Sequence, residues 1–158
     1  MKLTTKGRYA IIAMVDLVIN GKENAVPLKD ITKRQTISLS YLEQLFSKLR
    51  EAGLVKSVRG PGGGYTLGKN SSDINLLNII IAVDENIDQT QCKGEMNCTN
   101  DKPCLTHFIW ADLNKQINKY MQNITLNDIE ISEDTKKIIT FRENDKDKVE
   151  TRNLWKII

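Results

Sequence analysis

The chain has 158 residues, of which 40% are hydrophobic, so it fits one domain, or one small domain with an appendage, and offers no apolar run long enough to cross a membrane. Its three cysteines exclude a complete disulfide framework, and we expect a reducing, cytoplasmic setting with a metal or redox role for the thiols. Residues 1–69 carry 12 Lys and Arg against 5 Asp and Glu, whereas residues 70–158 carry 11 against 15, so we expect the first half to meet an anionic partner, nucleic acid or a membrane surface.

The first predicted element is a helix from about Thr5 to Asn20, which ends near Gly21. The basic start resembles that of a signal peptide, but Asp16 interrupts the apolar run after seven residues and no cleavage site follows. The apolar side chains instead share one helix face: Ile11, Ile12, Val15, Val18 and Ile19. We therefore interpret this segment as a helix of the folded domain.

Two more helices are predicted on either side of a short break. "LKDITKRQT" indicates a short helix, and in "TISLS" either Ser38 or Ser40 is placed to cap the next one. "SYLEQLFSKLREAGL" has apolar residues at helical spacing, and Gly53 ends it. A helix, a short break and a second helix form the layout of a helix-turn-helix.

A glycine-rich stretch, "VRGPGGGYTLGKN", follows and holds five of the nine glycines. Gly63, Gly68 and Lys69 match a phosphate-binding loop, but Asn70 replaces its Ser or Thr and "NSSD" does not open a helix. The alternative is a β-hairpin whose glycines permit positive φ and a close approach to another backbone, that of DNA. We favour the hairpin, which after a helix-turn-helix makes a winged helix, with Arg59 placed to enter the minor groove.

The second half is predicted to be helical around one irregular loop. "INLLNIIIAVDE" indicates an apolar helix packed on the first one, and "NIDQTQCKGEMNCTNDKPC" indicates a loop. A long helix, "LTHFIWADLNKQINKYMQNIT", and a short cap, "LNDIEI", come next. Apolar residues of the long helix recur at steps of 3 and 4, as in a coiled-coil seam: Trp110, Leu113, Ile117, Tyr120 and Ile124. We expect a homodimer; the alternative is a seam packed on its own domain.

The chain therefore divides into four predicted parts within a mainly α fold that contains one small β-hairpin. We expect a winged helix-turn-helix domain over 1–84, a cysteine-bearing loop over 85–104, and a dimerisation helix with its cap over 105–130. The remainder, 131–158, has 13 charged residues among its 28, and we expect a mobile tail.

A candidate DNA-reading face lies on the second helix of the motif, whose exposed N-terminal part would enter the major groove. Gln pairs with adenine, Glu accepts from cytosine N4, and Ser is permissive. The candidate base-reading residues are Ser38, Ser40, Tyr41, Glu43 and Gln44. Lys48 and Arg50 are candidates for phosphate contacts. Any one of these residues could simply belong to a solvated helix face. As a set they lie in the basic half of the chain beside a wing, so we favour DNA binding.

A candidate metal site is formed by Cys92, Cys98 and Cys104, spaced six positions apart, with the only histidine, His107, three positions after the last. If a helix begins near Cys104, its first turn places Cys104 and His107 on one face. The alternatives are free thiols, which make a metal-free redox sensor, a structural zinc site of three cysteines and one histidine, and an iron–sulfur cluster. The spacing does not name the metal.

The sequence also resembles a known family. "ISLSYLEQLFSKLREAGLVKSVRGPGGGYTLGK", "AVDENIDQTQC", "CLTHFIWADL" and "NITLNDI" are similar to the bacterial iron–sulfur cluster regulators of the winged-helix repressor family. The likeness runs from Met1 to about Ile131. It implies a [2Fe–2S] cluster on Cys92, Cys98, Cys104 and His107.

The resemblance further implies a homodimer on palindromic double-stranded DNA, with wing contacts by Arg59, Gly60 and Pro61 beside the five helix residues above. The cluster-bound form would repress the operon for cluster assembly, whose machinery would donate the cluster, and the cluster-free form would act on a second class of sites. We hypothesise that Glu43, a carboxylate facing phosphate, rejects one class of sites. An electron-transfer enzyme is the rival class, but the sequence offers neither a Rossmann fingerprint nor a second cluster motif, so we expect no enzyme.

Overall fold

The structure is a computed structural model that describes residues 4–90 and 92–154, with side chains as far as residue 144. In this part of the chain the only sheet is a two-stranded antiparallel one, so the fold is mainly α with a small β-hairpin. The elements in chain order are α1 (Thr5–Asn20), α2 (Leu28–Gln35), α3 (Leu39–Glu51), β1 (Val55–Val58), β2 (Gly64–Leu67), η1 (Ser71–Asp73), α4 (Leu76–Ala82), α5 (His107–Gln122), α6 (Leu126–Ile131) and α7 (Glu133–Leu154).

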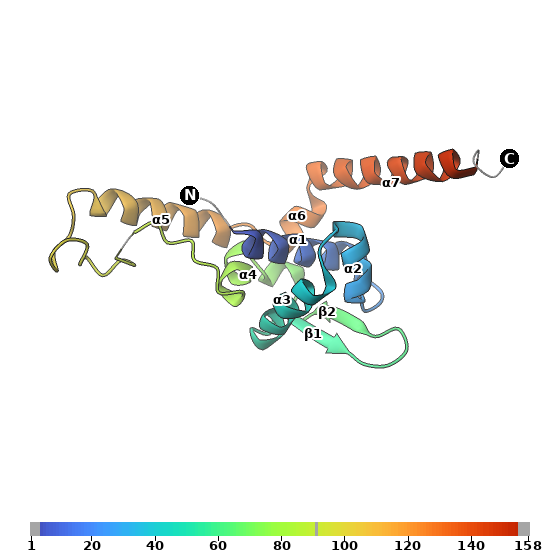
Figure 1. Cartoon of the computed structure of the whole chain (residues 1–158), viewed down its shortest axis with the longest axis horizontal. Coiled ribbons are helices and arrows are strands. Elements are labelled where there is room, and N and C mark those ends of the chain that lie inside the picture. Colours follow the sequence, from blue (N-terminus) through green and yellow to red (C-terminus); the bar gives the residue numbers. More distant parts are fainter. Residues whose placement is uncertain (1–3, 91, 155–158) are drawn as a thin grey trace.

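Helices α1, α2 and α3 enclose the core, and the hairpin lies beside α3 (Figure 1). Their apolar faces point inward because the apolar residues recur at helical spacing. The largest fully buried side chains come from all three helices, from β1, from α4 and from α6: Met14, Leu17, Ile31, Leu42, Phe46, Leu49, Val55, Ile79, Ile80 and Leu126. The turn between α2 and α3 passes through Thr36, whose φ of 56° reverses the chain direction. This is the predicted helix-turn-helix.

A buried ion pair fixes α2 against α1. The Asp16 side chain is almost fully buried and accepts hydrogen bonds from Arg34 Nη2 at 2.6 Å and Arg34 Nε at 3.0 Å. Gln35 Nε2 donates to the same carboxylate at 2.6 Å. The residue that interrupts the apolar face of α1 in the sequence therefore has its charge satisfied by α2.

The wing is held in register by main-chain pairing and by one aromatic contact. Val55 pairs with Leu67 and Val58 with Gly64. Tyr65 also exchanges two main-chain hydrogen bonds of 2.9 Å with Val26, and its ring packs on that of Phe46 at 4.8 Å. The hairpin is thus fastened to both the segment before α2 and the helix α3.

The glycines of the wing serve two different purposes. Gly60 and Gly62 have φ of 101° and 75°, as predicted for a hairpin tip. At Gly64 a Cβ would lie 2.4 Å from the carbonyl carbon of Val26. One close backbone approach that the sequence analysis assigned to DNA is therefore made within the chain itself.

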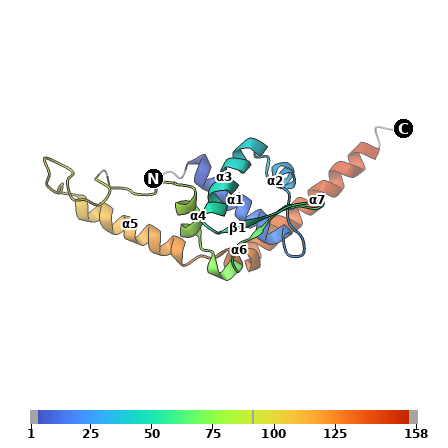
Figure 2. The ribbon, with the colours of Figure 1, turned by 90° about the horizontal axis from the view of Figure 1, so that it is seen from below.

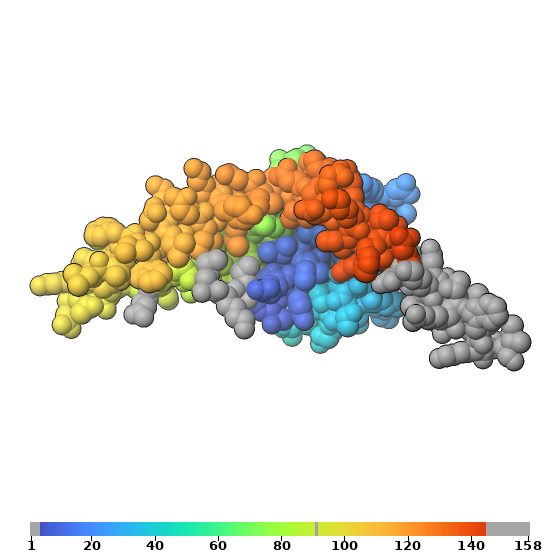
Figure 3. All heavy atoms as spheres, turned by 90° about the horizontal axis from the view of Figure 1, so that it is seen from above, coloured from blue at the N-terminus to red at the C-terminus, as the bar shows by residue number. Residues whose placement is uncertain are grey.

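Helix α4 packs on α1 as predicted, and α5 and α7 extend from the body in opposite directions (Figure 2). The long helix α5 begins at His107, two residues after the predicted start at Leu105. The amide of His107 donates to the carbonyl of Cys104 at 3.1 Å, which closes a turn just before the helix. Viewed from above, α5, α6 and the first part of α7 form one continuous side of the molecule (Figure 3).

The segment expected to be a charged tail contains helix α7. Its start is capped by Ser132, whose Oγ accepts from the amide of Thr135 at 3.2 Å. Lys136 pairs with Glu133 at 3.0 Å within the first turns. Arg142 Nη1 donates to Gln35 Oε1 at 3.3 Å, which joins α7 to α2. The local ion pairs and the cap give this charged segment helical structure that its composition does not predict.

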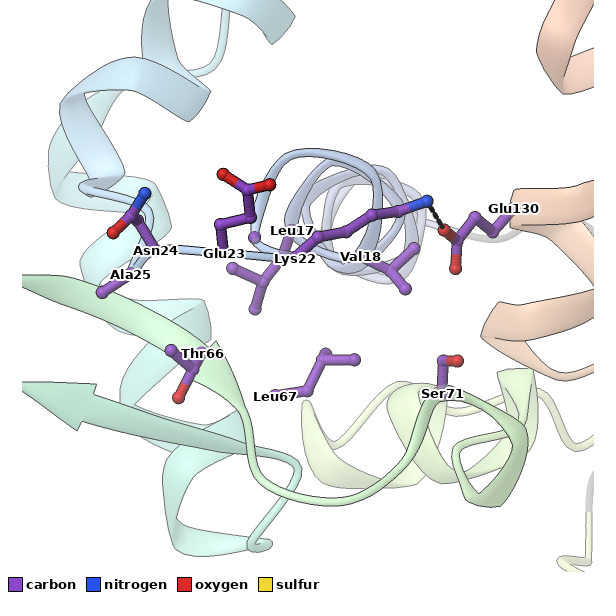
Figure 4. A pocket seen from close by; sticks show the side chains of 11 residues that line it. Leu17, Val18, Lys22, Glu23, Asn24, Ala25, Thr66, Leu67, Ser71 and Glu130 are labelled. Atoms are coloured by element: carbon purple, nitrogen blue, oxygen red, sulfur yellow. Dashed lines mark ion pairs between the residues drawn. The ribbon is translucent and has the colours of Figure 1, made fainter.

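One pocket of about 410 Å³ lies where the end of α1 and the following turn meet β2, η1 and α6 (Figure 4). Leu17, Val18 and Leu67 line it, and an ion pair of 2.6 Å between Lys22 and Glu130 connects its two sides. Its lining contains no cysteine or histidine. Within the described residues, no helix combines the length and apolar character needed to span a membrane.

Candidate metal centre and DNA interface

The described loop before α5 brings two cysteines and the histidine together. Sγ of Cys92, Sγ of Cys98 and a ring nitrogen of His107 all lie within 4.8 Å of one another. Nδ1 of His107 is 3.5 Å from Sγ of Cys92 and 3.4 Å from Sγ of Cys98. His107 is only 4% exposed although it is the first residue of α5. Two thiols and an imidazole facing one point form a donor set for a thiophilic metal.

The Cys92 thiol is prepared for ionisation. Burial raises its pKa, but a hydrogen bond with Cys98 and further hydrogen bonds from the backbone of Met96 and Gly94 and from Thr90 outweigh burial and lower the pKa to about 6. At neutral pH this thiol is mostly thiolate, the form that binds metals.

Cys104 lies beside the group of three rather than within it. Its Sγ is 3.6 Å from Oγ1 of Thr106, and hydrogen bonds from the Thr106 side chain and backbone lower its pKa. It also contacts Cys98: a backbone hydrogen bond from Cys104 lowers the pKa of the Cys98 thiol, but thiol hydrogen bonds with Cys92 and Cys104, together with burial, raise it overall. Of the four predicted ligands, the structure therefore brings three together and places the fourth next to one of them.

Two acidic residues that the sequence analysis did not select anchor the start of the loop. Glu85 is 7% exposed and accepts hydrogen bonds from the amide and hydroxyl of Thr4 at 2.9 Å and 2.5 Å. Lys6 Nζ donates to the carbonyl of Asp84 at 2.7 Å, and the Asp84 side chain pairs with Lys48. Their partners are about 36 to 81 positions away, so no local pattern marks them.

The predicted base-reading residues lie on one end of α3. Ser38 is at the N-cap position, and Ser40, Glu43 and Gln44 are exposed in the first turns. Tyr41 is half-buried because its ring packs edge-on against that of Tyr9 at 5.8 Å. Four side chains of the predicted set are thus open to a partner, and Tyr41 is held by α1.

The predicted wing residues are at the tip of the hairpin. Arg59, Gly60 and Pro61 are all exposed between β1 and β2. Lys48 differs from the expectation, because its ammonium group is paired with Asp84 instead of being free for phosphate.

The outer face of α5 is apolar and open. Several large side chains of this helix are exposed, including three of the predicted seam residues: Phe108, Ile109, Trp110, Leu113 and Tyr120. Leu105, two residues before the helix, is exposed as well. Phe108 is 68% exposed and Tyr120 also 68%. Apolar surface of this kind marks an interaction site.

A family model described as "Rrf2: Iron-dependent Transcriptional regulator" matches residues 3–130. The chain is 56% identical over 129 residues to the HTH-type transcriptional regulator IscR of Vibrio campbellii. The aligned segment covers 82% of this chain and 77% of that protein. It is 51% identical over 145 residues to the regulator of the same name from Serratia proteamaculans, covering 92% and 88%.

Solved structures show the same architecture. The global cysteine regulator CymR of B. subtilis superposes with a TM-score of 0.72 at 33% identity, covering 82% of this chain and 96% of that one. IscR of T. potens superposes with a TM-score of 0.68 at 38% identity, covering 82% and 85%. The winged helix-turn-helix arrangement predicted from the sequence is confirmed by these neighbours.

Proposed function

The chain belongs to the Rrf2 family of iron-dependent transcriptional regulators and is a DNA-binding regulator, and from this premise we propose that it senses iron–sulfur status through a [2Fe–2S] cluster. The observation that carries the proposal is the convergence of Cys92, Cys98 and His107 in a chain that also has a winged helix. A regulator of this kind acts on chromosomal DNA in the cytoplasm.

Four residues would hold the cluster: Cys92, Cys98, Cys104 and His107. The first, second and fourth already face one another, and Cys104 contacts Cys98. The donor set fits, because thiolates are the usual ligands of iron–sulfur clusters and histidine replaces cysteine in some of them. When bound, the group supplies one-electron redox chemistry and sensitivity to iron supply and oxygen.

The protein residues tune this site in two ways. The lowered pKa of Cys92 provides a thiolate at neutral pH without the cost of deprotonation. His107 contributes an uncharged ligand, so the set carries less negative charge than four thiolates would. Three thiolates and one imidazole are therefore an easier set to release than four thiolates.

The DNA contacts follow from the winged helix. We assign base reading to Ser38, Ser40, Tyr41, Glu43 and Gln44 at the start of α3, and minor-groove and backbone contacts to Arg59, Gly60 and Pro61 at the wing tip. The exposed side chains and the basic first half of the chain support this assignment.

A homodimer on a palindromic operator completes the proposal. The exposed apolar face of α5 supports it, since a lone helix with this face gains from pairing with a second copy. The cluster-bound dimer would repress the operon for cluster assembly, the assembly machinery would donate the cluster, and the cluster-free dimer would act on other sites. Such an arrangement is feedback on cluster supply.

The test is the visible absorption spectrum of protein purified without oxygen, with iron, sulfide and zinc assayed on the same sample. Broad visible bands with about two irons and two sulfides per chain are expected for a cluster of this class. A colourless protein with one zinc per chain would contradict the sensing function and leave a structural clamp.

A second measurement distinguishes the proposed cluster sensor from a metal-free thiol sensor. Non-reducing electrophoresis after peroxide treatment would show a disulfide-linked form if the three cysteines act by thiol oxidation. Two variants, Cys92→Ala and His107→Ala, provide the controls, because a thiol sensor that uses Cys92 needs this thiol but not the imidazole.

A further inference from the structure

Helix α5 holds the cysteine loop at a second point, Asn114, which the sequence analysis did not select. Asn114 lies seven positions after His107, two helical turns away, so both side chains are on the same face of α5. His107 faces the thiols, and Asn114 faces the segment that leads to Cys92.

Asn114 contacts this segment through both ends of its amide. Its Oδ1 accepts a hydrogen bond from the amide of Gln89 at 2.7 Å. Its Nδ2 donates to Oδ1 of Asp88 at 2.5 Å. Asn114 therefore accepts one hydrogen bond and donates the other. Together the two bonds fix where the segment at Asp88 and Gln89 lies on α5 and which way it runs.

The contact continues to Cys92 through Thr90. Oδ1 of Asp88 also accepts from the amide and the hydroxyl of Thr90, at 2.6 Å and 2.7 Å. Oγ1 of Thr90 accepts in turn from the amide of Gly94 at 2.8 Å. Thr90 is 8% exposed, so these bonds are shielded from water. The chain on both sides of Cys92 is therefore tied, through one threonine and one aspartate, to Asn114.

We propose that Asn114, acting through Asp88 and Thr90, is a positioning residue that keeps Cys92 beside His107 without any metal. These hydrogen bonds join protein atoms alone, so the clamp does not depend on a bound metal. The consequence for the cluster rests on the proposed function: a loop that stays pre-organised loses its cluster more slowly and accepts a new one without reordering.

The experiment compares Asn114→Ala with Asn118→Ala, a matched control in which the same residue type is removed from an exposed position one turn further along α5. Amide hydrogen exchange on metal-free protein is the first readout. We expect exchange at Gln89, Thr90 and Gly94 to be about fivefold faster or more in Asn114→Ala, because both hydrogen bonds of the Asn114 amide are lost. Asn118→Ala should match the unaltered protein.

The second readout is the half-life of the visible absorption when anaerobically purified protein is exposed to an iron chelator. We expect a half-life several-fold shorter in Asn114→Ala and unchanged in Asn118→Ala. Asp88→Asn keeps the shape of the side chain but removes its charge. It should also speed amide exchange and shorten the cluster half-life, as Asn114→Ala does.

Unchanged exchange at Gln89 and Gly94 in Asn114→Ala would overturn the clamp itself. Faster exchange with an unchanged cluster half-life would overturn the positioning role. If the unaltered protein holds no iron, the proposed function fails, but the exchange measurement on metal-free protein still decides whether the clamp exists.

Discussion

Lys48 of helix α3 forms an ion pair with Asp84, the second residue after the end of α4, with 2.5 Å between Nζ and Oδ2. A hydrogen bond with Lys48 and the charge of its ammonium group lower the pKa of Asp84, and Lys6 adds to this. Lys48 lies one turn after Gln44 on the same face of α3. The residue immediately before the cysteine-bearing loop therefore contacts the helix that we assign to DNA reading.

Removing the charge of Asp84 should release Lys48 toward DNA. Asp84→Asn keeps a residue that tolerates the φ of 51° at this position. We expect tighter binding to a random-sequence duplex at low salt, and a slope of log affinity against log salt that is steeper by about 0.9 per protomer. Fluorescence anisotropy over a salt series measures it. Asp134→Asn, the same change on α7, is the control, and an unchanged slope in Asp84→Asn would show that Lys48 does not reach phosphate.

Removing the carboxylate of Glu43 should change which sites the cluster-free protein accepts. Glu43 is exposed on α3, where phosphate and base acceptors repel it unless a donor such as cytosine N4 meets it. We expect Glu43→Ala to narrow the difference in affinity between the two classes of site by about 1 kcal/mol or more. Competition binding with both operators measures this, with Glu43→Gln to separate charge from shape. An unaltered preference would refute the hypothesis.

Glu85 should make the stability of the fold depend on pH in the acidic range. Burial raises its pKa, but hydrogen bonds from Thr4 and the charge of Lys6 lower it below the ordinary 4.5. A carboxyl group whose pKa is lower in the folded than in the unfolded protein stabilises the fold at pH values above its unfolded pKa. This stabilisation is lost as the pH falls through the folded pKa. Glu85→Gln should lower the free energy of unfolding by about 1–3 kcal/mol at pH 7, and by progressively less below about pH 4.5.

Urea unfolding of Glu85→Gln and of the unaltered protein at several pH values measures this difference. Glu143→Gln, at an exposed position of α7, provides the control and should show no such trend. A cost that stays constant down to pH 3 would contradict the assignment.

Breaking the buried pair between α1 and α2 should be strongly destabilising. Arg34→Ala leaves the Asp16 carboxylate, 2% exposed, with Gln35 as its remaining side-chain donor. An uncompensated buried charge costs about 3–5 kcal/mol in the free energy of unfolding. Chemical denaturation gives the value, and Lys33→Ala on the same helix, whose ammonium is exposed, should change it by less than about 1 kcal/mol.

Cys104 should be needed for the cluster but not for every metal. Cys92, Cys98 and His107 form a group without it, so we expect Cys104→Ala to lose the visible iron–sulfur absorption and still bind Co²⁺. Cys92→Ala should lose both. Iron and sulfide assays and the absorption of bound Co²⁺ measure the two properties. Full cluster retention in Cys104→Ala would remove Cys104 from the proposed ligand set.

The sequence predicts the elements of the first half well because its signals are local. The bounds of α1, the break at Ser38 and the turn glycines each lie within a few residues of the structure that they specify. The predicted apolar face of α1 is wrong in part: the helix turns Ala10, Ala13, Met14 and Leu17 into the core together with Val18, and Ile12 is 39% exposed. The partner of Asp16 is different: Arg34 is 18 positions away, and no periodicity connects them. The sequence shows Asp16 only as an interruption of an apolar face, and the fold shows what pairs with it.

The second half shows where local reasoning fails. The sequence predicts that α5 starts at Leu105, but Leu105 and Thr106 lie in a turn closed by the carbonyl of Cys104, and the helix starts at His107. Composition alone predicted no helix after Ile131, whereas the i to i+3 ion pairs and the Ser132 cap support α7. The spacing of the cysteines led to the metal site, but Asn114 and Asp88 carry no motif, and only the folded chain brings them to the loop.

Gly64 and Arg59 of the wing should differ in their rates of evolutionary change. At Gly64 any side chain would collide with the main chain of Val26, so this position is constrained by folding alone. Arg59 is exposed at the tip, so under the proposed function the constraint on it comes from a nucleic-acid partner. In a lineage that no longer binds DNA, Arg59 would drift while Gly64 stayed fixed. The glycine pattern is therefore a marker of the winged fold, and the arginine beside it is the marker of its activity.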